Sequence, residues 1–446
     1  MRRQWARRAT SVPGPRAALA GLVAVILVGT VLGPVPWFGV SANALASGLA
    51  ALQAPTGARG LGAPSPLTGS AQLSFGQWSN LTSSSGAPPS PRADYGMAYD
   101  PLLGGVVLYG GVTSAESPLG DTWEFTAAGW HNLTPSLSPA PPARWGAGMV
   151  YDPALHALLL FGGHFATGAL NTLNDTWEFT GAGWTELHPA VSPPPMDGLF
   201  MVYDSTDGYP FLWGFTEEGA PYSYWTFEGG AWENITSAST GTLPPVNFYG
   251  ANDPQVGGVL FYGGFPYPGY PICSGGLTYT YSHGVFTNLT PTESSEPAAV
   301  MGSGVMAYVP PEQGVVLFSG YTASCTLSNA TWAFRDGAWV NLTAQIGPPP
   351  PGRWDARFVY DPLLNGAVTF GGNENQFAGA DQFGNDTWEY RVGESHVFCN
   401  LNWGNGSCSV HPHGKCTPWP ALRLFRPFGR LGWGGLGRRP WRVCLP

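Results

Sequence analysis

Charged residues are scarce in this 446-residue chain, and positive charge is nearly missing from most of it. Only 11% of the residues are Asp, Glu, Lys or Arg. All 28 acidic residues lie between Asp94 and Glu394, whereas the chain from Arg92 to Glu394 contains only six arginines and no lysine. A protein this poor in positive charge repels a phosphate backbone, so nucleic acid is excluded as a partner.

Long amphipathic helical stretches are also missing after residue 60. The 63 glycines and 44 prolines interrupt nearly every window that a helix would need, and both residue types favour turns. Together with 13% aromatic residues, this composition is typical of many short strands joined by turns. The sequence therefore predicts an all-β fold with little helix outside the N-terminus.

The two ends of the chain differ from the rest. Residues 1–46 contain five arginines, then the apolar run AALAGLVAVILVGTVL and the small residues SANALAS, which predicts a signal peptide or, if uncleaved, a membrane anchor. Residues 47–72 are rich in Ala, Gly and Pro and are expected to form a flexible linker. Residues 403–446 contain no Asp or Glu, and we expect a basic, unstructured tail. The N-terminus predicts a secreted or cell-surface protein that meets the membrane only through this segment.

The region between them, residues 73–402, contains six repeats. Each has a turn related to YDPLLGGVVLYGG (99–111), then a strand of the TWEF type, then an aromatic residue followed by NLT or a relative. The repeats are spaced 49 to 56 residues apart. Four short strands at this period predict a β-propeller, because such a sheet buries both faces only by stacking against its neighbours. Six four-stranded blades are predicted, with seven as the alternative.

The sequence leaves open how the ring closes. QWSNLT at 77–82 is a lone fourth strand that precedes the first repeat and can complete the last blade. HVFCNLN at 396–402 resembles the fourth strand GVFTNLT at 284–290, so the last repeat has a candidate of its own. One strand is therefore in surplus.

These repeats resemble the kelch repeat. The resemblance rests on a glycine pair that ends the second strand, an aromatic residue in the third, a tryptophan in the fourth, and the arginine of PPARW and PPGRW. The glycine pairs are Gly110–Gly111, Gly162–Gly163, Gly263–Gly264 and Gly371–Gly372. The resemblance implies a propeller similar to the central domain of galactose oxidase. The chain has no adjacent Tyr-His pair to match the copper site of that enzyme, so no metal or cofactor is expected.

Several residues are predicted to serve the structure. The third-strand tryptophans are expected to pack between blades rather than stack on a ligand; they are Trp123, Trp177, Trp332 and Trp388. Cys273 and Cys325 precede the third strands of consecutive repeats, which makes them candidates for a disulfide between neighbouring blades. Nine Asn-x-Ser/Thr sequons fall mostly at equivalent places in the repeats, so the repeat itself accounts for much of their number.

Ligand binding is predicted on the face that carries the loops between second and third strands and the loops between blades. The candidate residues are Arg92, Arg144, Arg353, Arg357, Tyr267, Tyr270 and Asn375. Arg357 takes the place that Gly96 and Gly148 have in other first strands, so it is expected to project into the central channel. The other three arginines match the recurring kelch arginine, and for them the alternative is that they tie loops to backbone carbonyls.

No catalytic signature accompanies these residues. The chain has no G-x-S-x-G nucleophile elbow and no phosphate-binding loop. We therefore favour a monomeric, non-catalytic binding or adhesion module for protein or glycan ligands at the cell surface. An extracellular carbohydrate-active enzyme, either a glycosidase or an oxidase, is the alternative, because carboxylates from distant loops can converge in the fold.

Overall fold

The computed structural model describes most of the predicted propeller. The described residues are 76–166, 171–216, 222–244, 246–265, 276–290, 297, 305–322, 324, 326–375, 381–393, 396–400 and 407–411. The predicted signal or anchor segment and the linker lie outside the described residues. Within the described part of the chain, no helix is long and apolar enough to span a membrane.

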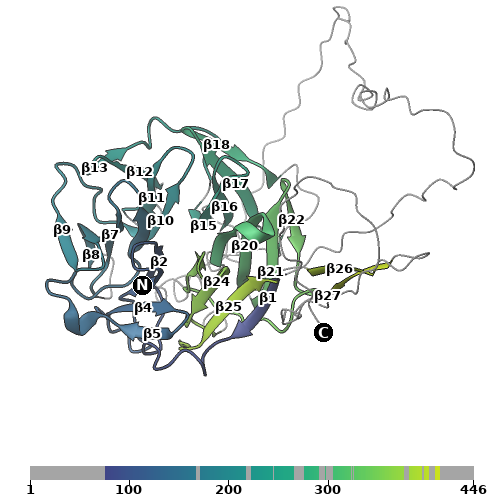
Figure 1. Cartoon of the computed structure of the whole chain (residues 1–446). Helices are drawn as coiled ribbons and strands as arrows, with labels where there is room; N and C mark the ends of the chain where they lie inside the picture. Colours follow the sequence, from purple (N-terminus) through teal and green to yellow (C-terminus); the bar gives the residue numbers. More distant parts are fainter. Residues whose placement is uncertain are drawn as a thin grey trace, which may run out of the picture. The chain divides into compact units, whose positions relative to one another are not determined.

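Six four-stranded antiparallel sheets follow one another around a ring (Figure 1). Blade 1 contains β2 (Gly96–Asp100), β3 (Gly105–Tyr109), β4 (Thr122–Thr126) and β5 (Gly129–Asn132). Blade 2 contains β6 (Gly148–Asp152), β7 (Ala157–His164), β8 (Thr172–Phe179) and β9 (Trp184–Leu187). Blade 3 contains β10 (Asp197–Asp204), β11 (Tyr209–Phe215), β12 (Ser223–Glu228) and β13 (Ala231–Asn234).

The second half of the ring repeats this order. Blade 4 contains β15 (Val246–Asp253), β16 (Gly258–Phe265), β17 (Leu277–Ser282) and β18 (Val285–Asn288), with β14 (Thr240–Gly241) added in parallel beside β18. Blade 5 contains β19 (Val305–Val309), β20 (Gly314–Tyr321), β21 (Leu327–Arg335) and β22 (Ala338–Asn341). Blade 6 contains β23 (Phe358–Asp361), β24 (Gly366–Phe370), β25 (Thr387–Val392) and β1 (Gly76–Asn80). Helix in the described residues is limited to short 3-10 turns such as η1 (Thr134–Ser136) and η3 (Pro310–Glu312). The predicted all-β, six-bladed propeller is confirmed.

The last blade is completed by the N-terminal strand. Residues of β1 pair antiparallel with β25, from Gly76 opposite Val392 to Asn80 opposite Trp388; Figure 1 shows this purple strand beside the yellow end of the ring. The competing strand β26 (His396–Asn400) pairs instead with β27 (Ser407–His411) in a separate hairpin. The surplus strand is thus used in the hairpin, and part of the predicted unstructured tail forms a strand.

The recurring Asp-Thr-Trp phrase is explained by contacts between blades. In five of the six seams, the fourth-strand tryptophan donates its indole N–H to the hydroxyl of a threonine in the third strand of the neighbouring blade. These pairs are Trp184–Thr122 (3.0 Å), Trp232–Thr176 (3.0 Å), Trp339–Thr278 (2.9 Å), Trp78–Thr331 (3.0 Å) and Trp130–Thr387 (2.8 Å). Each indole is also buried between two sheets. The Trp–Thr pair therefore packs the two blades together and gives the buried indole N–H a hydrogen-bond acceptor.

The sequence predicts that the third-strand tryptophans pack between the blades. Trp177 is buried, whereas Trp123, Trp332 and Trp388 are only half-buried beside the blade cores. The indoles of Trp123, Trp177 and Trp388 each donate to the aspartate two residues earlier, at 2.6 to 2.7 Å. The fourth-strand tryptophans therefore fill the wedge between blades more completely than the third-strand ones.

The Asn-x-Thr triplets have a structural function of their own. In blade 1, the Asn132 side-chain oxygen accepts the Thr134 N–H (2.9 Å), and the Thr134 hydroxyl accepts the Thr122 N–H of the third strand (2.8 Å). The Asn contact recurs at Asn80, Asn234, Asn288 and Asn341. Such an Asx turn ends the fourth strand without leaving the backbone donors unpaired, which is why the triplet recurs in the repeats.

Candidate functional site

The three arginines that begin blades 1, 2 and 6 are buried inside the ring wall. Arg144 donates to both carboxylate oxygens of Asp175, at 2.6 and 2.7 Å, and to the Gly162 carbonyl at 2.9 Å. Arg92 makes the same contacts with Asp121 and the Gly110 carbonyl, and Arg353 with Asp386 and the Gly371 carbonyl; their side chains are 0% exposed.

These contacts control the charge of the aspartates. Burial of Asp175 alone would disfavour ionisation, but the hydrogen bonds and charge of Arg144 outweigh it and hold the pKa of Asp175 below its usual value. A bidentate pair of this kind is strong and fixed in geometry. The guanidinium groups of these three arginines therefore bind carboxylates and backbone carbonyls of the chain itself. This arrangement agrees with the alternative given above, in which the arginines tie loops to backbone carbonyls.

The same contacts explain the glycine pairs. Gly110 and Gly111 have positive φ values, 69° and 104°. The φ values of the equivalent glycines are also positive; these are Gly162, Gly163, Gly371 and Gly372. A Cβ on Gly110 would lie 2.5 Å from the Arg144 carbonyl oxygen. Glycine is therefore required both by its backbone conformation and by the close approach of the next blade. Gly263 has a φ of 114°.

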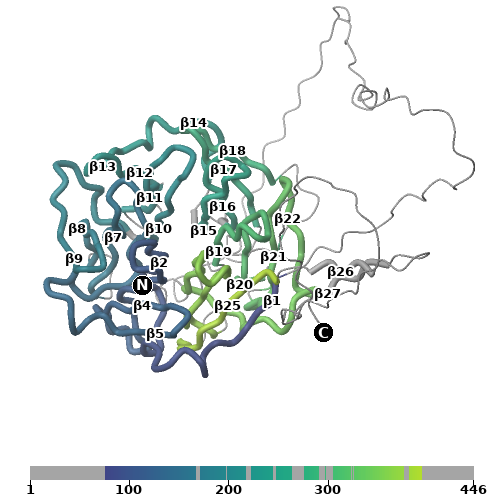
Figure 2. Tube along the Cα trace, in the orientation of Figure 1, coloured from purple at the N-terminus to yellow at the C-terminus, as the bar shows by residue number. Residues whose placement is uncertain are grey.

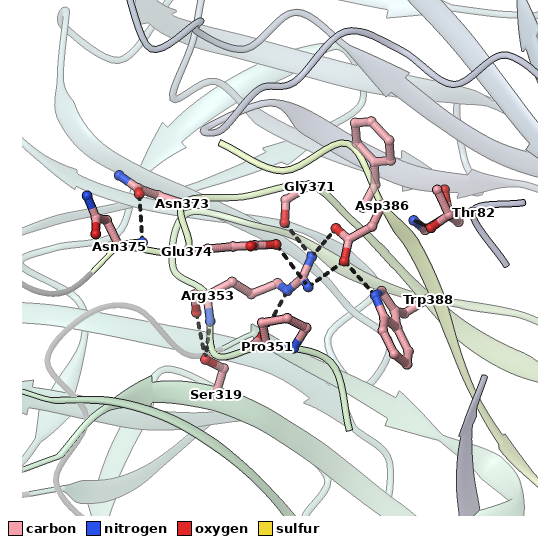
Figure 3. Close-up of polar contacts among 12 residues, drawn as sticks. Thr82, Ser319, Pro351, Arg353, Gly371, Asn373, Glu374, Asn375, Asp386 and Trp388 are labelled. Atoms are coloured by element: carbon pink, nitrogen blue, oxygen red, sulfur yellow. Dashed lines mark hydrogen bonds and ion pairs between the residues drawn. The ribbon is translucent and has the colours of Figure 1, made fainter. Parts of the chain in front are cut away.

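Blade 6 adds a second carboxylate to its arginine (Figure 3). Glu374 lies 3.4 Å from the Arg353 guanidinium, which also holds Asp386. Burial raises the pKa of Glu374, while Arg353 holds the pKa of Asp386 low despite its burial. Asn375, a predicted ligand residue, is half-buried in this loop, where its backbone N–H donates to Asn373 and its carbonyl accepts from Tyr321.

The central channel forms a cavity with a volume of about 500 Å³. The first strands β2, β6, β10, β15, β19 and β23 surround it, and Figure 2 shows β2, β10, β15 and β19 around the middle of the ring. Methionines line it from four blades, at Met97, Met149, Met201 and Met306. These methionines are 4 to 7% exposed and belong to the hydrophobic cores of the ring, so their side chains mostly fill the wall of the channel.

One mouth of the channel carries a ring of tyrosines. The YDP turns place them at equivalent positions, with Asn252 completing the ring; they are Tyr99, Tyr151, Tyr203, Tyr308 and Tyr360. Burial, followed by the charges of nearby aspartates, raises the pKa of Tyr99, Tyr151 and Tyr203. These phenols therefore stay neutral and can donate hydrogen bonds.

Arg357 reaches across the channel, as the sequence predicts. Its guanidinium carbon lies 5.4 Å from the centre of the Phe200 ring, which belongs to the opposite blade. The equivalent residues in blades 1 and 2 are Gly96 and Gly148, which leave room for the long side chain. One guanidinium nitrogen donates to the Ala356 carbonyl (3.0 Å). Among the described residues that line the cavity, Arg357 alone carries a charged side chain.

Other predicted residues lie outside the described part of the chain. These are the ligand candidates Tyr267 and Tyr270 and the disulfide candidates Cys273 and Cys325. Among the residues that the structure does describe, no group of three or more His, Cys, Asp or Glu side chains is placed to hold a metal ion. Sequence reasoning missed Phe200 and the tyrosine ring, although aligning the six first strands by their YDP turns would have found both.

No family model matches the chain, and no curated protein matches it. Among solved structures, it is similar to one titled "Structure of YjhT", at 14% sequence identity and a TM-score of 0.47, over 73% of this chain and 99% of that one. This similarity is too low for an argument about function, and the propeller assignment rests on the strand pairing itself.

Proposed function

We propose that the protein is a secreted or cell-surface propeller of the kelch type that binds a protein or glycan ligand without catalysis. An acidic group of the ligand enters the central channel and pairs with Arg357. The observation that carries this proposal is the guanidinium over Phe200 in a channel whose other described lining side chains are uncharged.

The chemistry of the channel supports an anionic partner. Of the Arg357 side-chain nitrogens, only Nη1 has a hydrogen-bond partner among the described residues, so Nε and Nη2 are available to a carboxylate. A guanidinium binds a carboxylate through two parallel hydrogen bonds, and the apolar walls strengthen that pairing by lowering the local dielectric. The predicted export of the chain supports a ligand at the cell surface.

A test uses the full chain and benzoate as a probe that joins a carboxylate to an apolar ring. Isothermal titration should show binding that weakens at least about tenfold in Arg357→Gln, since a charged hydrogen-bonding partner is lost. Arg391→Gln is the matched control, because this half-exposed arginine lies on β25, away from the channel lining. Equal affinity of Arg357→Gln and the parent chain would overturn the proposal.

A glycosidase is the second candidate, and the Glu374–Asp386 pair favours it. Two carboxyl groups whose environments move their pKa values apart suit an acid and a base, and blades 1 and 2 have no carboxylate at the Glu374 position, where Thr113 and Phe165 stand. A panel of nitrophenyl glycosides tests it. Turnover by the full chain that is lost in Glu374→Gln would support the enzyme, and no turnover with any glycoside would reject it.

A further inference from the structure

The hydrogen-bond ladder of blade 6 differs from that of the other blades at Arg357. In the other blades, the residue at this position pairs directly with a residue of the second strand. Such pairs are Gly96–Tyr109, Gly148–Phe161, Phe200–Trp213, Tyr249–Tyr262 and Val305–Phe318. In blade 6 the ladder begins one residue later, at Phe358 opposite Thr369. Arg357 and Phe370 are therefore not paired as their equivalents are.

The hydroxyl of Tyr95 occupies the gap. Its oxygen accepts the Arg357 backbone N–H at 3.2 Å, and the hydroxyl donates to the Phe370 carbonyl. Tyr95 comes from blade 1, and its side chain is fully buried in the seam with blade 6. Burial raises the pKa of Tyr95 to about 12, so the phenol keeps the proton that it donates. One hydroxyl thus bridges the backbone groups of Arg357 and Phe370, whose equivalents in the other blades are direct partners in the sheet register.

This tyrosine has no counterpart among the described repeats. In blades 2, 3, 4 and 6, the residues equivalent to Tyr95 are Ala147, Leu199, Phe248 and Ala356. None of these side chains has a hydroxyl. Because β24 lies outside β23 in the blade, a hydroxyl between the strands displaces Arg357 away from β24 and toward the channel axis. This is the direction in which its side chain must extend to reach Phe200 on the opposite blade.

We propose that Tyr95 is a positioning residue, which holds Arg357 out of the ladder so that its guanidinium lies over Phe200 and faces a ligand in the channel. The inference rests on the proposed binding function for its biological meaning, but the geometry can be tested without any ligand. A purely structural Tyr95 would stabilise the seam and leave the guanidinium position unchanged when its hydroxyl is removed.

The first measurement is the NMR signal of the Arg357 Nε–H group in the full chain labelled with ¹⁵N-arginine. Arg357→Lys identifies the signal, and Phe200→Leu gives its position without the aromatic ring. In Tyr95→Phe the ladder can close, so the signal should move toward its position in Phe200→Leu. The control Tyr109→Phe removes another buried hydroxyl, which bonds to Pro141, and should leave the signal in place.

The second measurement is benzoate affinity by titration. Tyr95→Phe should bind about fivefold more weakly than the parent chain, the cost of about one misplaced hydrogen bond, and Tyr109→Phe should bind equally well. Tyr95→Leu introduces the residue that blade 3 has at the equivalent position, Leu199, and replaces Tyr95→Phe in both measurements if that variant does not fold. An unmoved Arg357 signal in Tyr95→Phe, or in Tyr95→Leu if the Phe variant does not fold, would overturn the inference. Absence of benzoate binding by the parent chain would instead count against the proposed function, and the NMR result would still decide the role of Tyr95.

Discussion

The indole N–H of Trp130 in blade 1 donates to the hydroxyl of Thr387 in blade 6, at 2.8 Å. This bond joins the first and last blades of the ring across 257 residues of sequence. At the seam between blades 3 and 4 both partners change together, because Tyr224 replaces the threonine and Phe286 replaces the tryptophan, with ring centres 4.8 Å apart. Each seam between neighbouring blades therefore contains either a Trp–Thr hydrogen bond or a pair of aromatic rings.

A double-mutant cycle on Trp130→Phe and Thr387→Val should measure this bond. Each single variant leaves one buried polar group unpaired, so we expect a coupling free energy of about 1 kcal/mol in urea unfolding. The combination of Trp130→Phe with Phe286→Tyr, two sites in different seams, is the control and should be additive. Additivity of the Trp130 and Thr387 changes would show that the bond contributes nothing to closing the ring.

Breaking one arginine–aspartate pair should destabilise the ring strongly. Arg144→Met leaves the buried Asp175 carboxylate unpaired and should lower the free energy of unfolding by about 3 kcal/mol. Blade 3 has Met196 and Ser223 at these two positions, with the serine hydroxyl 3.1 Å from the methionine sulfur. The double variant Arg144→Met/Asp175→Ser copies blade 3 and should recover most of the loss in urea unfolding. A double variant no more stable than Arg144→Met would contradict this account.

Asp204→Asn should stabilise the protein at high pH. The Oδ1 atom of Asp204 accepts backbone N–H groups of Thr206 and Asp207, while Oδ2 is buried without a hydrogen-bond partner among the described residues. Burial raises the pKa of Asp204. A carboxyl whose pKa is raised on folding stabilises the fold while it is protonated, and this stability is lost as the pH rises through the folded-state pKa.

Asparagine resembles the protonated carboxyl at every pH. The melting temperatures of Asp204→Asn and the parent chain should therefore agree at about pH 4 and diverge toward about pH 8, with the variant higher. Asp336→Asn, at an exposed side chain in the turn between β21 and β22, is the control. A gap between Asp204→Asn and the parent that shrinks with rising pH would refute the assigned direction.

The N-terminal strand should be essential to the ring. Trp78 packs against Phe318, Phe358 and Tyr390, with ring centres 4.8, 5.5 and 5.3 Å away. Trp78→Ala removes this packing together with the bond to Thr331 and should cost about 4 kcal/mol. Leu102→Ala, at a side chain that is 61% exposed, should change stability by less than about 0.5 kcal/mol. Similar denaturant midpoints for the two variants would mean that β1 does not close the ring.

Much of this architecture follows from the sequence because it is local and repeated. The glycine pairs, the YDP turns and the strand aromatics each fix a backbone conformation or a buried face within one blade, and six copies reinforce the pattern. The position of Arg357 in the channel follows from alignment with Gly96 and Gly148, since equivalent positions in a repeat face the same way.

Contacts between repeats were decided only by the tertiary structure. The choice of QWSNLT over HVFCNLN for the last blade depends on packing among residues more than 200 positions apart, which no local pattern contains. The same is true of the tyrosine from blade 1 that enters the ladder of blade 6, and of the buried ion pairs that occupy Arg92, Arg144 and Arg353. The sequence by itself determined the blades, because strand and turn preferences are local; the tertiary structure decided how the ring closes and which arginine faces the channel, because burial and pairing depend on neighbours brought together only by folding.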